Sequence, residues 1–319
     1  MLGWIDQTSL SAVSLAGQVQ VVLSLFISGI AAGAGIMAAQ YWGKQDAASI
    51  EKVIPIALRT NLLFSGLFTI LAGFCPEMLM RIFTNDAALV ASGSQYLRAV
   101  ALSYVLCGIS QVYLILLKNT GHAAVSSRIS STAVVLNIIL NAILIYGLCG
   151  APALGIRGAA YATVAARVVE LIWAYLETKK PERVRILWNR LFSSAGKILS
   201  EDFWRYTLPV LAASLVWGIA YVLYSVIMGH MGSDAVAANS ITSIAKSLLS
   251  CLIRGVSGGA GVLIGNLLGA DELEKAREYG GRLTHLAIAI GVVTGGLLML
   301  ISPAIVHFAP LTDTAAEYL

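Results

Sequence analysis

The chain has 319 residues, of which 58% are hydrophobic and only 12% are charged, and its mean hydropathy is +0.80. A soluble domain has about 25% charged residues, so this composition excludes a soluble enzyme, a nucleic-acid-binding protein and a disulfide-rich secreted module. Asp, Glu, Lys and Arg are absent from six long stretches: 7–43, 60–76, 99–117, 129–156, 206–233 and 283–312. Because a helix needs about 20 apolar residues to cross a bilayer, these stretches predict an all-α polytopic membrane protein.

Eight membrane-spanning helices are predicted, each an apolar run that ends at Gly, Pro or charged residues. In chain order they cover residues 12–41, 54–74, 95–117, 130–149, 157–177, 207–229, 236–267 and 281–302. The first and the seventh are long, and each has a cluster of glycines in its second half.

The basic residues predict the orientation of these helices. Of the 21 Lys and Arg residues, 15 lie after the first, third, fifth and seventh helices, and seven of those fall within 179–205. The opposite side has only Arg81, Arg98 and Arg157. Because loops rich in Lys and Arg stay cytoplasmic, we expect 179–205 to be a basic cytoplasmic linker and the first helix to run from outside to inside.

An internal repeat relates the two ends of the chain. A shift of 226 residues aligns Gly33-Ala34-Gly35-Ile36 with Gly259-Ala260-Gly261-Val262, and Gln40 with Asn266. The first helix then matches the seventh, and the second matches the eighth. Six spans separate each pair, so both copies have the same orientation, as in parallel repeats related by an axis along the membrane normal.

The repeat predicts the domain organisation. We expect an N-terminal lobe over 1–178, the linker over 179–205 and a partial C-terminal lobe over 206–319. Because Met1-Leu2-Gly3 matches the last turn of the sixth helix, we expect a helix before residue 1 and further helices after Leu319, so that the chain has eight of twelve helices.

An acidic and a basic residue lie together inside the fifth predicted helix. Glu170 is the one acid well inside a predicted span, and Arg167 precedes it by three positions on the same helical face. Ionisable residues inside a membrane are costly and are usually functional. The pair can line a cavity and serve proton coupling or substrate attraction, or it can fix helix packing as a mutually neutralised pair.

Several motifs resemble those of the multidrug and toxic compound extrusion (MATE) transporters. They are 33–46 with its echo 258–271, Asn137–Asn141 followed by Leu144–Gly147, Leu154–Thr163, and Leu208-Pro209. The resemblance implies two six-helix lobes that export organic, often cationic, compounds against a Na⁺ or H⁺ gradient across the plasma (inner) membrane. It implies a small organic substrate, no cofactor beyond the coupling ion, no nucleic acid and a monomer in the bilayer.

The resemblance also assigns residues to a cavity in the N-terminal lobe. Asn137 and Thr163 match cavity positions, whereas Asn141 stands where several members have the coupling aspartate. An asparagine cannot titrate, although its carbonyl can bind Na⁺. Asn137 and Asn141 are four residues apart and share one helical face. The alternative for all three residues is hydrogen bonding between helices.

In the C-terminal half, Trp217 stands where one branch of the family has a glutamate, and it can pack or stack on an aromatic cation. Lys246 and Arg254 lie inside the seventh predicted helix. If Arg254 faces the cavity, it favours anionic or zwitterionic substrates; otherwise it caps carbonyl groups of a bent helix.

The glycine pairs Gly29–Gly33 and Gly255–Gly259 have the GxxxG spacing that lets helices approach closely, and we assign them to helix packing. The four histidines lie near loops or helix ends and make no metal-binding constellation.

Three other classes of function were compared with an antiporter. A flippase for lipid-linked saccharides of the same superfamily needs a more cationic cavity, and only Arg167, Lys246 and Arg254 support it. An intramembrane enzyme is disfavoured, because HExxH and paired intramembrane aspartates are absent from the sequence, and a single intramembrane glutamate cannot supply an acid/base couple. A non-transporting fragment is the third alternative, because the expected path needs the helices beyond both ends.

Overall fold

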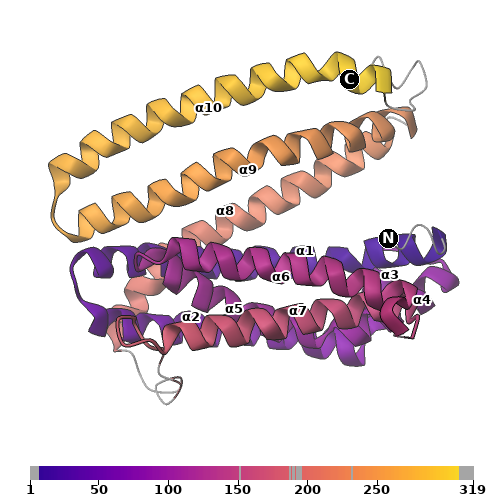
Figure 1. Ribbon diagram of the computed structural model, residues 1–319, viewed down its shortest axis with the longest axis horizontal. Helices are drawn as coiled ribbons and strands as arrows, with labels where there is room; N and C mark the ends of the chain where they lie inside the picture. Colours follow the sequence, from indigo (N-terminus) through magenta and orange to yellow (C-terminus); the bar gives the residue numbers. More distant parts are fainter. Residues whose placement is uncertain are drawn as a thin grey trace. The chain divides into compact units, whose positions relative to one another are not determined.

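The structure is a computed structural model that describes residues 7–150, 152–186, 188, 191, 196–230 and 233–308. These residues form helices and connecting loops, without a strand in the described ranges. The elements are α1 (Gln7–Gly43), α2 (Ala47–Phe74), α3 (Pro76–Arg81), α4 (Ala87–Val100), α5 (Leu102–Asn119), α6 (Ala123–Tyr146), the 3₁₀ helix η2 (Leu148–Gly150), α7 (Gly155–Thr178), α8 (Lys197–His230), α9 (Ser233–Gly269) and α10 (Leu273–Phe308) (Figure 1).

The predicted all-α membrane fold is confirmed. Among the described residues, seven helices are long and apolar enough to cross a bilayer: α1, α2, α5, α6, α7, α9 and α10. The remaining predicted span, 207–229, lies within the 34-residue helix α8. Most helices extend beyond the predicted spans, because their polar ends continue the backbone hydrogen bonding past the apolar run.

The third predicted span, 95–117, is wrong in one respect: it is not a single helix. The chain breaks at Ala101, between α4 and α5. The Ala101 carbonyl accepts a hydrogen bond from the Tyr104 N–H at 3.1 Å. The Thr69 hydroxyl of α2 lies 3.1 Å from the same carbonyl and 2.8 Å from the Ser65 carbonyl, and its single proton can bond to either of them.

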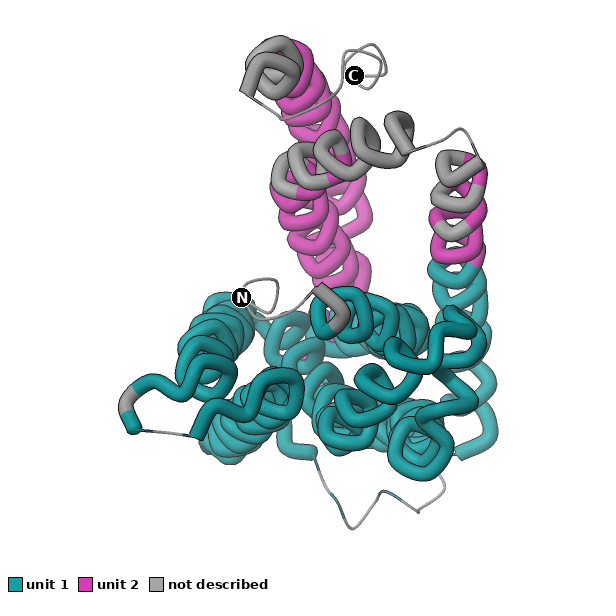
Figure 2. The backbone as a smooth tube through the Cα atoms, turned by 90° about the vertical axis from the view of Figure 1, so that its right-hand side faces the viewer, with its two compact units in different colours: residues 1–42, 46–215 teal, residues 43–45, 216–319 magenta. Residues whose placement is uncertain are grey.

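The described chain divides into two compact units, residues 1–42 with 46–215 and residues 43–45 with 216–319 (Figure 2). The division falls within α8, beyond the predicted linker 179–205. The linker's second part is already helical from Lys197. The predicted lobe boundaries, 1–178 and 206–319, stay a prediction.

The beginning of α8 belongs to the first unit because α1 has glycines where the two helices meet. A Cβ atom at Gly29 would lie 3.0 Å from Leu211 Cα, and one at Gly33 would lie 2.7 Å from Thr207 Cα. Such distances are shorter than ordinary van der Waals contact. The helices can therefore pack this closely only where side chains are missing.

The core of the first unit consists of three clusters of buried apolar residues. Tyr104, Tyr113 and Phe203 are among the largest fully buried side chains, one in each cluster. The Trp188 indole donates a hydrogen bond to the Tyr113 hydroxyl at 2.9 Å. The segment after α7 is thereby attached to the core.

The internal repeat is visible in local geometry. Helices α1 and α9 both have 37 residues, and α9 begins and ends 226 positions after α1 begins and ends. The turns that follow contain Gln45 with φ 58° and Asp271 with φ 61°, again 226 positions apart. Both turns are thus built alike, with a non-glycine residue in the left-handed region. The relation of the two copies by a membrane-normal axis stays a prediction.

Candidate functional site

Helices α6 and α7 form a close hairpin in the first unit. A Cβ atom at Gly158 of α7 would lie 2.7 Å from the carbonyl carbon of Leu144 in α6. The Leu154 N–H donates a hydrogen bond to the same Leu144 carbonyl at 2.9 Å. Glycine at position 158 therefore lets the helices meet backbone to backbone, which brings their polar side chains within hydrogen-bonding distance.

Asn137, Asn141 and Thr163 form one hydrogen-bonded cluster on this hairpin. The Asn141 amide donates to the Asn137 side-chain oxygen at 3.0 Å, and the Asn137 amide donates to the Thr163 hydroxyl at 3.3 Å. The structure thus brings together the three residues that the sequence places in a cavity; their role there stays a prediction.

The cluster has one free acceptor. Asn141 Oδ1 is buried and lacks a hydrogen-bond partner within the described part of the chain. Buried polar atoms are nearly always paired, and amide oxygens are suitable ligands for hard cations. Together with the oxygen atoms of Asn137 and Thr163, this atom is the most suitable Na⁺ ligand of the cluster.

Glu170 and Arg167 form a buried ion pair on α7. Arg167 Nη1 lies 2.6 Å from Glu170 Oε2, and the glutamate side chain is 2% exposed while the arginine side chain is 28% exposed. The Ser110 hydroxyl of α5 donates to the same carboxylate oxygen at 3.2 Å. Two helices therefore hold the carboxylate, and the arginine is its more accessible partner.

The arginine borders a cavity of about 240 Å³ between α1, α5 and α7, whose lining surface is mainly apolar. Side chains that can form hydrogen bonds are among its lining residues: Gln20, Ser24, Ser28, Tyr104, Gln111 and Arg167. The Tyr104 hydroxyl is buried without a hydrogen-bond partner in the described ranges. The charged residue that lines the cavity is Arg167, and its charge is neutralised by Glu170.

The amide cluster and the ion pair share one face of α7. Thr163, Arg167 and Glu170 follow one another at intervals of four and three residues, the spacing of a single helical face. The residues that line the 240 Å³ cavity include Arg167 but neither asparagine. The two polar groups are therefore neighbours on one helix but separate sites.

In the second unit, Trp217 and Arg254 lie together. The Arg254 guanidinium carbon is 5.6 Å from the centre of the Trp217 ring, and Trp217 stacks on Tyr221 with their ring centres 5.7 Å apart. Within the described residues, Arg254 has no carboxylate in ion-pair distance. Both rings are more than half exposed. Lys246 belongs to α9, but its side chain lies outside the described set.

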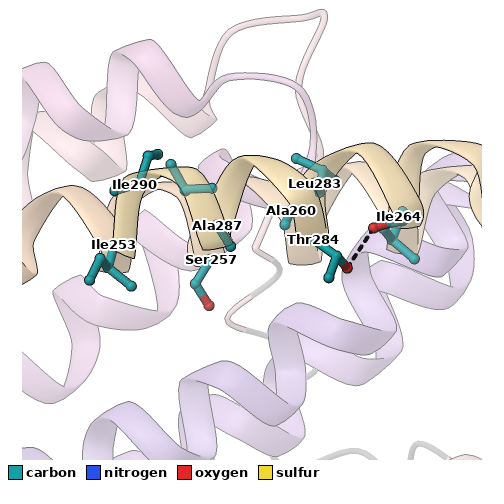
Figure 3. A pocket seen from close by; sticks show the side chains of 10 residues that line it. Ile253, Ser257, Ala260, Ile264, Leu283, Thr284, Ala287 and Ile290 are labelled. Carbon is teal, nitrogen blue, oxygen red and sulfur yellow. Dashed lines mark hydrogen bonds between the residues drawn. The ribbon is translucent and has the colours of Figure 1, made fainter. Parts of the chain in front are cut away.

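A groove of about 330 Å³ runs between α9 and α10 and is mainly apolar (Figure 3). Its hydroxyl groups are those of Ser257 and Thr284, and Thr284 donates to the Gly280 carbonyl at 2.8 Å. Gly255 and Gly259 have no atom within 4 Å of an added Cβ among the described residues. Unlike Gly29 and Gly33, they are therefore not seen in a close helix contact.

Sequence reasoning missed several residues of the site. Ser110 and the polar residues that line the 240 Å³ cavity were not singled out, although each is a polar residue inside an apolar stretch. That polarity is the signal that could have found them. The pairing of α5 with α7 depends on tertiary packing, which spacing within one helix does not reveal.

Known proteins of similar sequence identify the family. The model of the MatE family matches residues 1–143 and 209–318. Over 302 residues the chain is 22% identical to the "Uncharacterized transporter YisQ" of Bacillus subtilis, and the match covers 95% of this chain and 66% of that protein. It is 24% identical to the "Probable multidrug resistance protein NorM" of Agrobacterium fabrum, with 100% and 69% covered. The chain thus spans about two thirds of the length of these relatives.

Solved structures agree in fold. A MOP superfamily transporter from Pyrococcus furiosus has a TM-score of 0.84 at 22% identity, over 99% of this chain and 70% of that one. A MATE transporter in complex with MaD3S has a TM-score of 0.85 at 22% identity, with the same coverage. With the family model matching most of its length, the chain belongs to the MATE family of multi-pass membrane transporters.

Proposed function

We propose that this chain is the working part of a secondary antiporter in the plasma membrane, which exports organic, often cationic, drug-like compounds in exchange for Na⁺ or H⁺. The observation that supports it best is the Arg167–Glu170 ion pair at the edge of a cavity inside the first unit. Related transporters described as multidrug resistance proteins support the same class of substrate.

The ion pair suggests how a proton and a cation exclude each other. While Glu170 is ionised, it neutralises the guanidinium of Arg167, and a cation can enter the cavity without net repulsion. A proton on Glu170 removes that neutralisation, so Arg167 presents a full positive charge to the cavity. Like charges at close range in a poorly solvated site repel strongly, and a bound cation is released.

Sodium coupling has a separate candidate site at the amide cluster. Asn141 Oδ1, Asn137 and Thr163 offer oxygen atoms and no charge, so they can bind Na⁺ but cannot release a proton. The two coupling ions therefore depend on different residues. This separation makes them distinguishable by mutation.

The experiment measures export of ethidium from proteoliposomes that contain the full chain, with a proton gradient or a sodium gradient imposed. For H⁺ coupling, Glu170→Gln should abolish proton-driven export while ethidium binding remains measurable. The matched control is Glu177→Gln on the same helix, because Glu177 is paired with Lys180 and Arg183 away from the cavity. For Na⁺ coupling, Asn141→Asp should introduce pH dependence while Glu170→Gln leaves export intact.

The absence of export under both gradients would refute antiport by this chain. If Glu170→Gln exports normally across pH 6 to 8 and Asn141→Asp does not change the pH dependence of export, both residues serve helix packing rather than coupling. The flippase alternative gains little support from Arg167, because Glu170 neutralises it. Arg254 is the remaining described cation in its favour.

A further inference from the structure

A second cavity of the first unit lies beside the short helix α3. It has a volume of about 450 Å³, and its polar lining residues are Glu77, Arg81, Asn85, Ser94, Gln95 and Arg98. In Figure 1, α3 and α4 lie at the end of the first unit opposite the α1–α2 turn. That turn contains Lys44 and is predicted to be cytoplasmic, so the cavity lies on the predicted outer side.

The cavity has an excess of positive charge. Arg98 Nη2 lies 3.6 Å from Glu77 Oε1, whereas Arg81 has no carboxylate in ion-pair distance within the described chain. Two of the three basic residues predicted on the outer side thus line one cavity, with a single acid between them. Guanidinium groups in this arrangement favour phosphate oxygens, which they bind in a bidentate geometry.

The floor of the cavity holds an unused polar group. Ser94 is 5% exposed, and its hydroxyl has no hydrogen-bond partner in the part of the chain described. Gly93 beside it lets α3 pack tightly, because a Cβ atom there would lie 2.6 Å from the sulfur of Met80. A buried hydroxyl costs free energy unless it finds a partner, and an acceptor oxygen bound in the cavity would provide one.

Exposed apolar side chains lie close in sequence to the α3 residues that line the cavity. Phe74 is 82% exposed, Met78 is 62% exposed and Ile82 is 67% exposed, and all three lie on or directly beside α3. In a membrane protein, such side chains next to a charged end are suited to the level where headgroups meet acyl chains. A ligand with an anionic head and hydrocarbon chains can bind the basic cavity with its head and the exposed apolar side chains with its chains.

We propose that the α3–α4 cavity binds the phosphate of an anionic phospholipid, with Arg81 and Arg98 on the phosphate oxygens, Ser94 as a further donor, and the acyl chains along Phe74, Met78 and Ile82. Glu77 opposes the anion and limits its affinity. This site is independent of the proposed transport chemistry, since it shares no residue with the cavity at Arg167.

The test measures lipid binding to the purified full chain in detergent by native mass spectrometry. Dioleoylphosphatidylglycerol is compared with dioleoylphosphatidylcholine, which has the same chains but no net charge. Each basic residue near a charged lipid contributes about a fivefold gain in binding, so the protein should prefer phosphatidylglycerol at least about fivefold. The variant Arg81→Gln/Arg98→Gln should lose the preference, and Glu77→Gln should increase it.

The matched control is Arg157→Gln, which removes the third basic residue of the predicted outer side and does not line the cavity. It should leave the preference unchanged. Equal affinity for the two lipids, or an equal loss in the control and the double variant, would overturn the proposal. An affinity for glycerol phosphate equal to that for phosphatidylglycerol would also overturn it, because the acyl chains would then contribute nothing and the site would be one for free phosphate.

Discussion

The Arg167–Glu170 pair predicts an asymmetric response to mutation. At 2.6 Å and an effective dielectric constant of about 20, the attraction between the two charges is about 6 kcal/mol. Desolvation offsets part of it, and removal of one partner of a buried pair typically costs about 3–5 kcal/mol. Arg167→Gln should reach this range, because it leaves a carboxylate that is 2% exposed with Ser110 as its remaining partner.

The opposite change should cost less. In Glu170→Gln the unpaired group is the arginine, whose side chain is 28% exposed, so its guanidinium can remain solvated. We expect a loss of about 1–2 kcal/mol. The double variant Arg167→Gln/Glu170→Gln should be more stable than Arg167→Gln alone, because it has no buried charge without a partner.

A double-mutant cycle measures this directly. The free energy of unfolding is obtained for the four proteins by titration with sodium dodecyl sulfate in mixed micelles. A coupling energy of about 2 kcal/mol or more is expected for two buried charges in contact. Additive effects of the two single variants would refute the reasoning, because they would mean that the charges do not interact in the folded protein.

Three further predictions concern packing, hydrogen bonding and backbone conformation. Gly33→Ala should destabilise the protein by about 1–3 kcal/mol, because its Cβ would lie 2.7 Å from Thr207 Cα. Ser110→Ala should cost about 1–2 kcal/mol, because it removes a hydrogen bond to the buried carboxylate. Gln45→Gly should stabilise the protein by about 1 kcal/mol, because φ is 58° there and a side chain is unfavourable in that region. All three are measured by the same unfolding titration.

Each of these variants has its own control. Gly17→Ala on α1 meets no atom within 4 Å among the described residues and should be neutral or slightly stabilising, since alanine favours helix. Equal effects of alanine at positions 17 and 33 would contradict the packing argument. Unchanged stability in Ser110→Ala would show that the serine does not support the carboxylate. A loss of stability in Gln45→Gly would mean that the side chain contributes more than the backbone strain it causes.

The sequence predicts the helices well because apolar runs of 20 residues have few alternatives to a membrane span. It also predicts side-chain pairs within one helix, since Arg167–Glu170 and Asn137–Asn141 follow from spacing alone. The partners that come from other helices, such as Ser110, depend on tertiary packing and were not foreseen.

The elements that the sequence misplaces are those where local polarity and tertiary contacts disagree. Residues 197–205 are charged and look like a loop, yet α8 begins at Lys197, and Phe203 within it is fully buried in the first unit. The break at Ala101 has no Gly or Pro to mark it, and it lies where the Thr69 hydroxyl of a different helix approaches the Ala101 carbonyl. The α3–α4 cavity depends on tertiary packing and could not be predicted.

The turns at Gln45 and Asp271 are each stabilised within their own short segment. Only three residues separate α1 from α2, and three separate α9 from α10. Within the first turn, the Asp46 N–H bonds to the Tyr41 carbonyl at 2.9 Å, and Glu272 bonds to Leu267 in the same way at 3.0 Å. Each turn therefore satisfies part of its own backbone with a carbonyl five residues earlier, so its geometry depends on local residues rather than on contacts with other helices.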